Sequence, residues 1–366
     1  MRAIAASGVH HQAAHQVDHR YHLAGSIGGS VVRFHVFEFI CGGGLAGSPV
    51  PRQLAREGDL MLSAVVADLL ELPGVEVSFA RDARVPLPAH EPLRAARVCW
   101  RGLDPPPAQA LAREIAASDA IWPIAPETGG ELERTARAVL AAGRLLLGPH
   151  PDAIALTARK SATAARLAQA GIDVVPCFAP GTGWPAIDGP WIVKPDDGAG
   201  CVDARIVAGR DEAAAALGEP GGGLIAQPWI AGEAMSLCVL STQGKTDVAS
   251  VNRQHLQLDR GIVGLAAIEV NCEPVTAPVR ALAERVATAI PGLNGYFGID
   301  YIQAAAGPVV VEVNPRVTTS YARLRAALGV NAAEWVVAAA TGRPAPWKGA
   351  HRGQAVRLNL DGHERG

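Results

Sequence analysis

Apolar and polar positions repeat with two different periods in the first part of the chain. An apolar run at 31–40 has the character of a buried strand, and after the glycine-rich segment 41–44 a helical period extends from about residue 53 to residue 70. Further runs predict strands at 75–79, 120–123 and 145–147, with a helix at 131–142. This alternation of strands and helices predicts an α/β layer with a parallel sheet.

The glycine-rich turn after the first strand has two readings. Glycine allows a ligand to approach the backbone closely, which would suit a binding loop. The same residues also suit an ordinary tight turn, and the full GxGxxG spacing is absent. The pattern alone leaves both readings open.

The pattern changes between residues 149 and 157. A helix is predicted from about 159 to 170, and Gly171 is suited to end it. Strands, turns and two more helices follow in mixed order, which predicts an α+β region. The tail from about residue 341 ends in a predicted edge strand at 355–360. No internal repeat is visible, so we expect an α/β part followed by an α+β part.

Composition and charge narrow the class of protein. The chain has 366 residues, 49% of them hydrophobic, and can bury a large core. Its net charge of −2 and its interspersed charges offer no basic surface for nucleic acid, and no apolar run is long enough to span a membrane. No secretion signal opens the sequence. We therefore expect small-molecule partners and a cytoplasmic protein.

The cysteines and histidines were considered as metal ligands. The six cysteines show no metal-binding spacing, which predicts free thiols, mostly buried, in a reducing cytoplasm: Cys41, Cys99, Cys177, Cys201, Cys238 and Cys272. Five of the eleven histidines lie in the first 30 residues, namely His10, His11, His15, His19 and His22. Such a tract is able to bind metal, but the lack of apolar periodicity favours a disordered extension at 1–30.

A predicted hairpin near the end of the chain carries candidate metal ligands. Two alternating apolar runs flank a turn at Gly307, so Asp300 on one strand and Glu312 and Asn314 on the other can project from neighbouring strands. Glu312 and Asn314 share a face because they are two residues apart. Carboxylate and amide oxygens suit Mg²⁺ bound to a nucleotide phosphate. The alternative is a strand whose polar residues face water.

Two lysines are candidates for binding phosphate. Lys194 ends an apolar strand at 191–195 and precedes Gly198 and Gly200, whose backbone N–H groups are accessible to an anion. Lys160 lies on the helix predicted before this strand and adds a second positive charge. The alternative for Lys160 is a solvated helix face.

The segment 224–236 reads as a strand, a turn and a second strand. Its backbone is suited to pair with an adenine edge, while Ile225 and Trp229 enclose the ring. Trp229 is equally consistent with ordinary core.

Taken in order, these motifs resemble the ATP-grasp superfamily. The resemblance rests on Lys160, on Lys194-Pro followed by Gly198 and Gly200, on a Gln-x-Trp-Ile-x-Gly-Glu linker at 227–233, on Gly298-x-Asp300, and on Val-Glu312-x-Asn314-Pro-Arg316. It covers about residues 156–331. It implies a preATP-grasp parallel-sheet domain at 31–150, followed by a two-lobed ATP-grasp domain with lobes at 151–235 and 236–366, the second of which carries the metal site.

The resemblance assigns site residues. It implies that Lys160, Lys194 and the loop with Gly198, Gly200 and Cys201 hold the ATP phosphates, that Gln227, Pro228, Trp229 and Ile230 hold adenine, and that Asp300, Glu312 and Asn314 bind Mg²⁺ or Mn²⁺. Many members hold the ribose with an acid two residues after the linker glycine. This chain has Ala234 there, so Glu233 is expected to act from a shifted position.

A second departure concerns the charge that stabilises the transition state. Many peptide-ligase members have an arginine two residues before the metal aspartate, where this chain has Gly298. Arg316 and Arg253 are the candidates to replace it. The superfamily's usual reaction forms an acyl phosphate from a carboxylate and ATP, which an amine then converts to an amide; Mg²⁺ and arginine neutralise the charge that develops on the phosphate oxygens.

Three segments at 37–44, 120–132 and 250–254 resemble the tyramine–glutamate ligase family of methanofuran biosynthesis and its bacterial relatives, and similar pieces occur in the pyrrolysine-pathway ligase. This resemblance implies glutamate as the carboxylate, tyramine or tyrosine as the amine, and a homodimer, with substrate contacts at Glu38, Gly43, Glu127 and Asn252. Turn capping is the alternative for Glu38 and Glu127. His255 is either a base or structural. A ligase for other amino acids and a phosphotransferase remain alternative functions.

Overall fold

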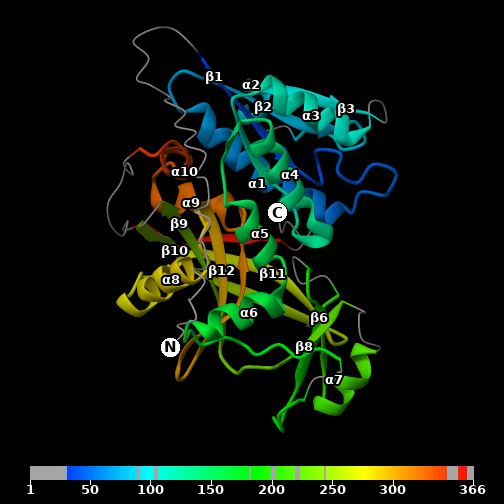
Figure 1. Ribbon diagram of the computed structural model, residues 1–366. Coiled ribbons are helices and arrows are strands. Elements are labelled where there is room, and N and C mark those ends of the chain that lie inside the picture. Colours follow the sequence, from blue (N-terminus) through cyan, green and yellow to red (C-terminus); the bar gives the residue numbers. More distant parts are fainter. Residues whose placement is uncertain are drawn as a thin grey trace, which may run out of the picture.

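The computed structural model describes residues 31–360 except 89–90, 103–105, 181–182, 199–202, 219–222, 243–244 and 344–352. The predicted extension at 1–30, Gly200 and Cys201 therefore lie outside the described residues. The described chain forms two sheets that are joined through helices (Figure 1).

The first sheet is parallel, as predicted. Its five strands are, in spatial order, β3 (Arg97–Arg101), β2 (Val75–Asp82), β1 (Val32–Glu38), β4 (Ala120–Ile124) and β5 (Leu145–Leu146). The helices of this part are α1 (Arg52–Leu70), α2 (Glu91–Ala95), α3 (Pro107–Ala117) and α4 (Glu131–Ala141), with a 3₁₀ turn, η1 (Thr128–Gly130). The sequence reading missed β3, α2 and α3. Parallel strands bring the turns after β1 and β4 to one edge of the sheet.

The second sheet has nine strands in antiparallel pairs, which confirms the α+β prediction. Its spatial order is β13 (Gly307–Asn314), β12 (Gly295–Ala304), β9 (Glu233–Thr242), β10 (Lys245–Asp259), β11 (Ile262–Glu273), β7 (Arg205–Val207), β6 (Trp191–Pro195) and β8 (Leu224–Pro228). The predicted tail strand is β14 (Val356–Asn359), which also pairs with β11. Strand β9 spans the domain boundary that we expected at 235/236.

Helices α5 (Pro151–Thr157) and α6 (Lys160–Gln169) connect the two sheets, and the other helices of the second part are α7 (Arg210–Leu217), α8 (Ala277–Ala289), α9 (Tyr321–Leu328) and α10 (Ala332–Thr341). Gly171, two residues after α6, has a φ of +71°, the left-handed conformation that a terminating glycine provides. In Figure 1, strands β6 and β8 and helix α7 form one end of the molecule, and the parallel sheet forms the other.

A shared core fixes the two sheets relative to one another. Asp68 of α1 is buried and accepts hydrogen bonds from the Tyr321 hydroxyl at 2.8 Å and from Arg325 Nη1 at 3.1 Å, both on α9. The Trp122 ring of β4 packs edge-on against Tyr321, with 6.0 Å between ring centroids. These contacts hold α1 and β4 of the first part against α9 of the second part.

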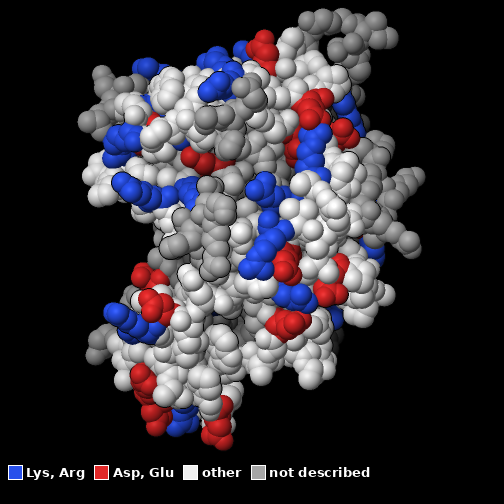
Figure 2. Space-filling model, turned by 180° about the vertical axis from the view of Figure 1, so that it is seen from behind, with Lys and Arg blue, Asp and Glu red and all other residues white. Residues whose placement is uncertain are grey.

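The surface carries interspersed charges. Basic and acidic side chains lie next to one another on the face in Figure 2, which agrees with the alternating signs along the sequence. None of the helices in the described ranges is both long and apolar enough to cross a membrane.

Candidate active site

The predicted hairpin forms and brings its three polar side chains together. Asp300 of β12 is opposite Glu312 of β13, and Gly298 is opposite Asn314. Asn314 Nδ2 donates a hydrogen bond to Asp300 Oδ2 at 3.1 Å, and Asn314 is only 9% exposed. The alternative of polar residues that simply face water is therefore wrong, because Asp300 and Glu312 line a pocket.

The electrostatics of this pair favour a bound cation. Burial, and then the neighbouring charge of Glu312, raise the pKa of Asp300 to about 8. Burial opposes ionisation of Glu312, but Lys160, Lys194 and Arg316 together hold its pKa below the ordinary value. Among the described residues no three His, Cys, Asp or Glu side chains converge on a metal site. Two carboxylates and the Asn314 carboxamide are nevertheless oxygen donors of the kind that would hold Mg²⁺.

Both predicted lysines lie at the same end of the pocket. Lys160, the first residue of α6, is 7% exposed; its Nζ lies 3.4 Å from Glu312 Oε2 and donates to the Gly198 carbonyl. Lys194 on β6 is 8% exposed. Both side chains line the pocket, so the solvated alternative for Lys160 is wrong.

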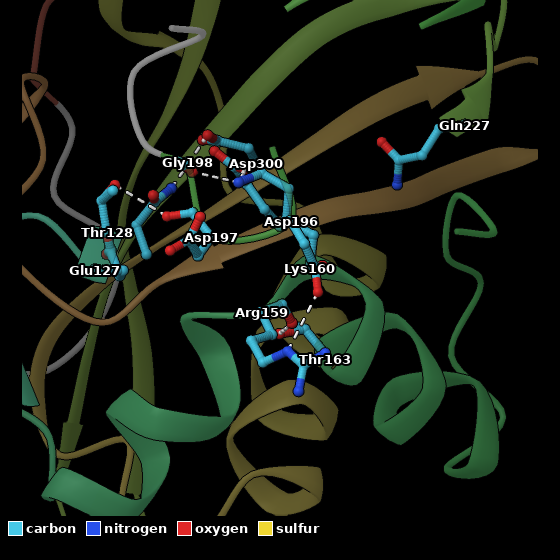
Figure 3. A network of polar contacts seen from close by, with 12 residues as sticks. Glu127, Thr128, Arg159, Lys160, Thr163, Asp196, Asp197, Gly198, Gln227 and Asp300 are labelled. Carbon is cyan, nitrogen blue, oxygen red and sulfur yellow. Dashed lines mark hydrogen bonds and ion pairs between the residues drawn. The ribbon is translucent and has the colours of Figure 1, made fainter. Parts of the chain in front are cut away.

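Asp196 holds the first turn of α6, which begins at Lys160. Its carboxylate accepts hydrogen bonds from the Ser161 backbone N–H and from the Ser161 hydroxyl, both at 2.7 Å, and so caps the first turn of α6. Figure 3 shows Lys160, Gly198 and Asp300 near one another and Gln227 at the other side of the view. The pocket thus has a charged end, and Gln227 lines it at a distance from that end.

The other end of the pocket has mainly apolar walls. The predicted linker residues Gln227, Pro228, Trp229 and Ile230 all line it. Trp229 is 42% exposed, so its alternative reading as core is wrong. Sequence reasoning missed the other apolar walls, which include Val175, Ile192, Ala204, Leu256, Val263, Ile302 and Val311. An apolar slot of this kind suits a flat aromatic ring such as adenine.

Gln227 holds the linker in place through its side chain. Its amide Nε2 donates to the Val175 carbonyl at 3.3 Å and contacts Cys177 Sγ at 3.1 Å, and the residue is 1% exposed. The side-chain N–H groups thus serve the protein, and so does the Trp229 backbone N–H, which donates to the Pro190 carbonyl at 2.9 Å.

The structure brings neither Glu233, the expected ribose contact, nor Arg253 into the pocket. The Glu233 side chain is 62% exposed, lies 3.6 Å from Arg253 Nη2 and does not line the pocket, whereas Ala234 does. Arg253 also pairs with Glu269 at 3.5 Å and Glu273 at 3.0 Å. The expectation that Arg253 neutralises the transferring phosphate is not supported, because three carboxylates already surround it.

Arg316 is an arginine that lies near the candidate metal ligands. Its side chain is 13% exposed, and its Nε lies 3.1 Å from Glu127 Oε1 of the first domain. Its Nη2 lies 3.5 Å from Asn314 Oδ1. Burial lowers the pKa of Arg316, but the carboxylates of Glu127, Glu312 and Asp300 outweigh burial and raise it. The positively charged guanidinium of Arg316 therefore lies at the contact between the two domains, next to the candidate metal ligand Asn314.

Gly298 lacks room for a side chain. A Cβ atom at this position would lie 2.7 Å from Thr318 Cγ2, closer than real contacts allow. Thr318 in turn shares a hydrogen bond of 2.8 Å with the Tyr296 hydroxyl. The packing against Thr318 therefore leaves no room for an arginine at this position, two residues before Asp300. The positive charge near Asp300 comes instead from Arg316, which follows the end of β13.

Three of the expected substrate contacts are occupied by the protein itself. Glu38 is 2% exposed and accepts hydrogen bonds from the backbone N–H groups of Cys41 at 2.6 Å and Ile40 at 3.2 Å, so it caps the turn. Gly43 has a φ of +88°, which makes it a turn glycine. Asn252 is fully buried, and its Oδ1 accepts from the Asn271 N–H at 3.1 Å. Glu38 and Asn252 therefore have partners within the protein.

His255 also has protein partners. Its Nε2 lies 3.3 Å from Glu269 Oε1 and 3.3 Å from Arg357 Nη1. This favours the structural reading over a catalytic base.

Burial of Glu38 predicts a pH-dependent stability. Burial raises the pKa of Glu38 to about 7 from 4.5, so the folded state retains the proton more strongly than the unfolded state. The associated stability is present below pH 4.5 and is lost as pH rises through about 7, a change of about 3 kcal/mol. We expect Glu38→Gln to remove this loss in urea unfolding at pH 5 and pH 8.5. Glu76→Gln, at an exposed glutamate of β2, should retain it; equal pH profiles for wild type and Glu38→Gln would contradict the assignment.

The first domain also contacts the loop that follows Lys194. The Thr128 hydroxyl donates to the Asp197 carbonyl at 3.0 Å, and the Gly129 N–H donates to Asp197 Oδ2 at 3.2 Å. The turn after β4 therefore contacts Arg316 through Glu127 and Asp197 through Thr128 and Gly129. Figure 3 shows Glu127 and Thr128 beside Asp197. The predicted loop residues Gly200 and Cys201 lie outside the described residues.

Two family models match this chain. Residues 75–154 match the pre ATP-grasp 3 domain, and residues 157–320 match the ATP-grasp domain. The second match contains Lys160, Lys194, the linker and all three candidate metal ligands. The order of domains agrees with the order of the two sheets.

Similar proteins include ligases. A stretch of 94 residues, 26% of this chain, is 34% identical to tyramine–L-glutamate ligase of Methanocaldococcus jannaschii and spans 29% of that protein's length. Among solved structures, an ATP-grasp superfamily protein from Archaeoglobus fulgidus is 21% identical with a TM-score of 0.64, covering 90% of this chain and 100% of that one. L-amino acid ligase from Bacillus licheniformis is 16% identical with a TM-score of 0.59, covering 86% and 75%. These structural likenesses show the fold.

Proposed function

We propose that this chain, which carries a pre-ATP-grasp domain followed by an ATP-grasp domain, is an ATP-dependent ligase that joins a carboxylate to an amine. The observation that carries the proposal is one pocket with two different ends. Lys160, Lys194, Asp300 and Glu312 line its charged end, and the linker at 227–230 and apolar strand residues line the other. This arrangement suits a nucleotide, because the triphosphate requires charged partners and the base requires apolar walls.

The reaction has two steps. A carboxylate oxygen of the first substrate attacks the γ-phosphorus of ATP, the bond from this phosphorus to the β,γ-bridging oxygen breaks, and ADP leaves with the electron pair. The amine nitrogen of the second substrate then attacks the carbonyl carbon of the acyl phosphate. The carbon–oxygen bond to phosphate breaks, phosphate leaves, and the nitrogen loses its proton to solvent. No nucleophile from the protein is required.

Each proposed role follows from charge and position. Lys160 and Lys194 bind phosphate oxygens, and residues 227–230 bind adenine. Asp300, Glu312 and Asn314 hold Mg²⁺, which when bound neutralises charge on the phosphate oxygens. Arg316 stabilises the charge on the γ-phosphoryl oxygens during transfer, and Glu127 orients Arg316, since their side chains lie 3.1 Å apart. Catalysis in this scheme consists of positioning and electrostatic stabilisation.

We further propose glutamate, through its γ-carboxylate, and tyramine or tyrosine as the substrates, in a methanofuran-type cofactor synthesis. The 94-residue similarity to tyramine–L-glutamate ligase supports this choice. The junction between the turn after β4 and Arg316 is the place where the substrates would meet ATP, because Glu38 and Asn252 are buried within the protein.

The test is a matrix of carboxylates and amines with the full chain, ATP and Mg²⁺, in which ADP release and the mass of the product are measured. We expect ADP release with glutamate plus tyramine or tyrosine, an amide product, and background rates when either substrate is omitted. Turnover with other amino acids alone would contradict the substrates but not the ligase. A stable phosphorylated product formed without any amine would identify a phosphotransferase and overturn the ligase proposal.

A further inference from the structure

The metal-binding end of the pocket contains a polar side chain that the motifs do not account for. Gln254 of β10 lines the pocket together with Asp300 and Glu312. Its Nε2 donates a hydrogen bond to Asp300 Oδ1 at 3.2 Å. Asn314 Nδ2 holds the other oxygen, Oδ2, at 3.1 Å. Both oxygens of Asp300 are therefore oriented by carboxamides, from strands on the two sides of β12.

Small side chains on the intervening strand make this contact possible. Asp300 of β12 is opposite Ser236 of β9. Ser236 is in turn opposite Asn252 of β10, which lies two residues before Gln254. Ala234 is opposite Ile302 in the next row and also lines the pocket. Because Ser236 and Ala234 are small, the Gln254 side chain extends over β9 and reaches Asp300.

The partners of the neighbouring residues show that this arrangement is specific to Gln254. Arg253 points to the opposite face, where it pairs with Glu269 and Glu273. Asn252 is used within the sheet through the Asn271 backbone N–H. Gln257, later on the same strand, is exposed and does not line the pocket. Of these residues of β10, only Gln254 approaches a proposed metal ligand.

We propose that Gln254 is a positioning residue for the metal site. Its N–H group fixes the carboxylate plane of Asp300 so that an oxygen is presented to the cation bound with the nucleotide. Residues that orient a metal ligand affect metal affinity by about 10- to 100-fold when they are replaced. The inference rests on the proposed function, since it takes Asp300 to be a metal ligand.

The test is Gln254→Met, which keeps the length of the side chain but cannot donate a hydrogen bond. Mn²⁺ binding to the full chain is followed by electron paramagnetic resonance of free Mn²⁺ in the presence of ADP, and ADP affinity without metal is measured by calorimetry. We expect Mn²⁺ affinity to fall about 10-fold, with metal-free ADP affinity changed less than about threefold. Gln257→Met is the matched control, and it should bind Mn²⁺ as the wild type does.

Thermal unfolding separates positioning from misfolding. We expect the midpoint of Gln254→Met to match that of Gln257→Met, because both side chains retain their volume. Equal Mn²⁺ affinity in wild type and Gln254→Met would overturn the inference while leaving the ligase intact. Failure of the wild type itself to bind Mn²⁺ with ADP would overturn both the proposed function and the inference. Parallel losses of Mn²⁺ affinity, ADP affinity and midpoint would show a structural role and also overturn the inference.

Discussion

Asp300→Asn is expected to lower the rate of ADP release by a factor on the order of a hundred to a thousand at saturating ATP. The substitution keeps the shape of the side chain but removes one of the two carboxylates of the proposed metal site, so the charge that develops on the phosphate is less well neutralised. Burial of Asp300 disfavours its charged form and raises its pKa to about 8. Replacing it with a neutral amide should therefore leave the folded protein without bound metal at least as stable as the wild type.

Asp247→Asn provides a matched control for this prediction. Asp247 is also a buried carboxylate of the same sheet, on β10, and pairs with Arg280 Nη1 at 2.7 Å, but it does not line the pocket. Its substitution breaks an ion pair and should lower the unfolding midpoint while turnover is retained. The two variants thus give opposite patterns of stability and activity. If Asp300→Asn kept both its rate and its dependence on Mg²⁺, the metal assignment would be wrong.

Short-range patterns in the sequence were enough to predict the charged end of the pocket. The hairpin at Asp300 and Glu312 follows from alternation and one turn, and Lys194 follows from an apolar strand with glycine after it. These features depend on residues that are close in the chain, where the strand period decides which side chains share a face. The parallel sheet was predicted for the same reason, because each of its main strands is a distinct apolar run.

Features that depend on strand order could not be predicted in this way. The apolar walls Ile192, Val263 and Ile302 come from β6, β11 and β12, which become one pocket only through the pairing of the second sheet. Gln254 reaches Asp300 across β9 for the same reason. The ion pairs of Arg253 could not be predicted either, because Glu233 and Glu273 lie on other strands. Strand β3 has no distinct apolar run, because an arginine stands at each of its ends, and helix α2 has only five residues, too few to show a helical period.

Arg316→Met is the second variant for which we expect a large effect. It should reduce the maximal rate of ADP release by about a hundredfold or more, while the KM for ATP changes little. The reason is that Arg316 is not among the residues that line the nucleotide pocket, but its guanidinium lies 3.5 Å from Asn314 Oδ1 at the metal ligands. Its contribution should therefore appear in the transfer step and not in the affinity for ATP. Steady-state rates at varied ATP separate the two.

Two companion variants make the prediction specific. Arg323→Met removes an exposed arginine of α9 and should leave both constants unchanged. Glu127→Gln keeps a hydrogen-bond acceptor for Arg316 but removes the charge that lies 3.1 Å from its Nε, so we expect a smaller loss of rate than for Arg316→Met. Because Glu127 acts through Arg316, the double variant should be no slower than Arg316→Met alone. Additive losses of rate would instead indicate a separate contact between Glu127 and the substrate. A full rate in Arg316→Met would contradict the role of Arg316, and the charge on the transferring phosphate would then be neutralised by the lysines and the metal alone.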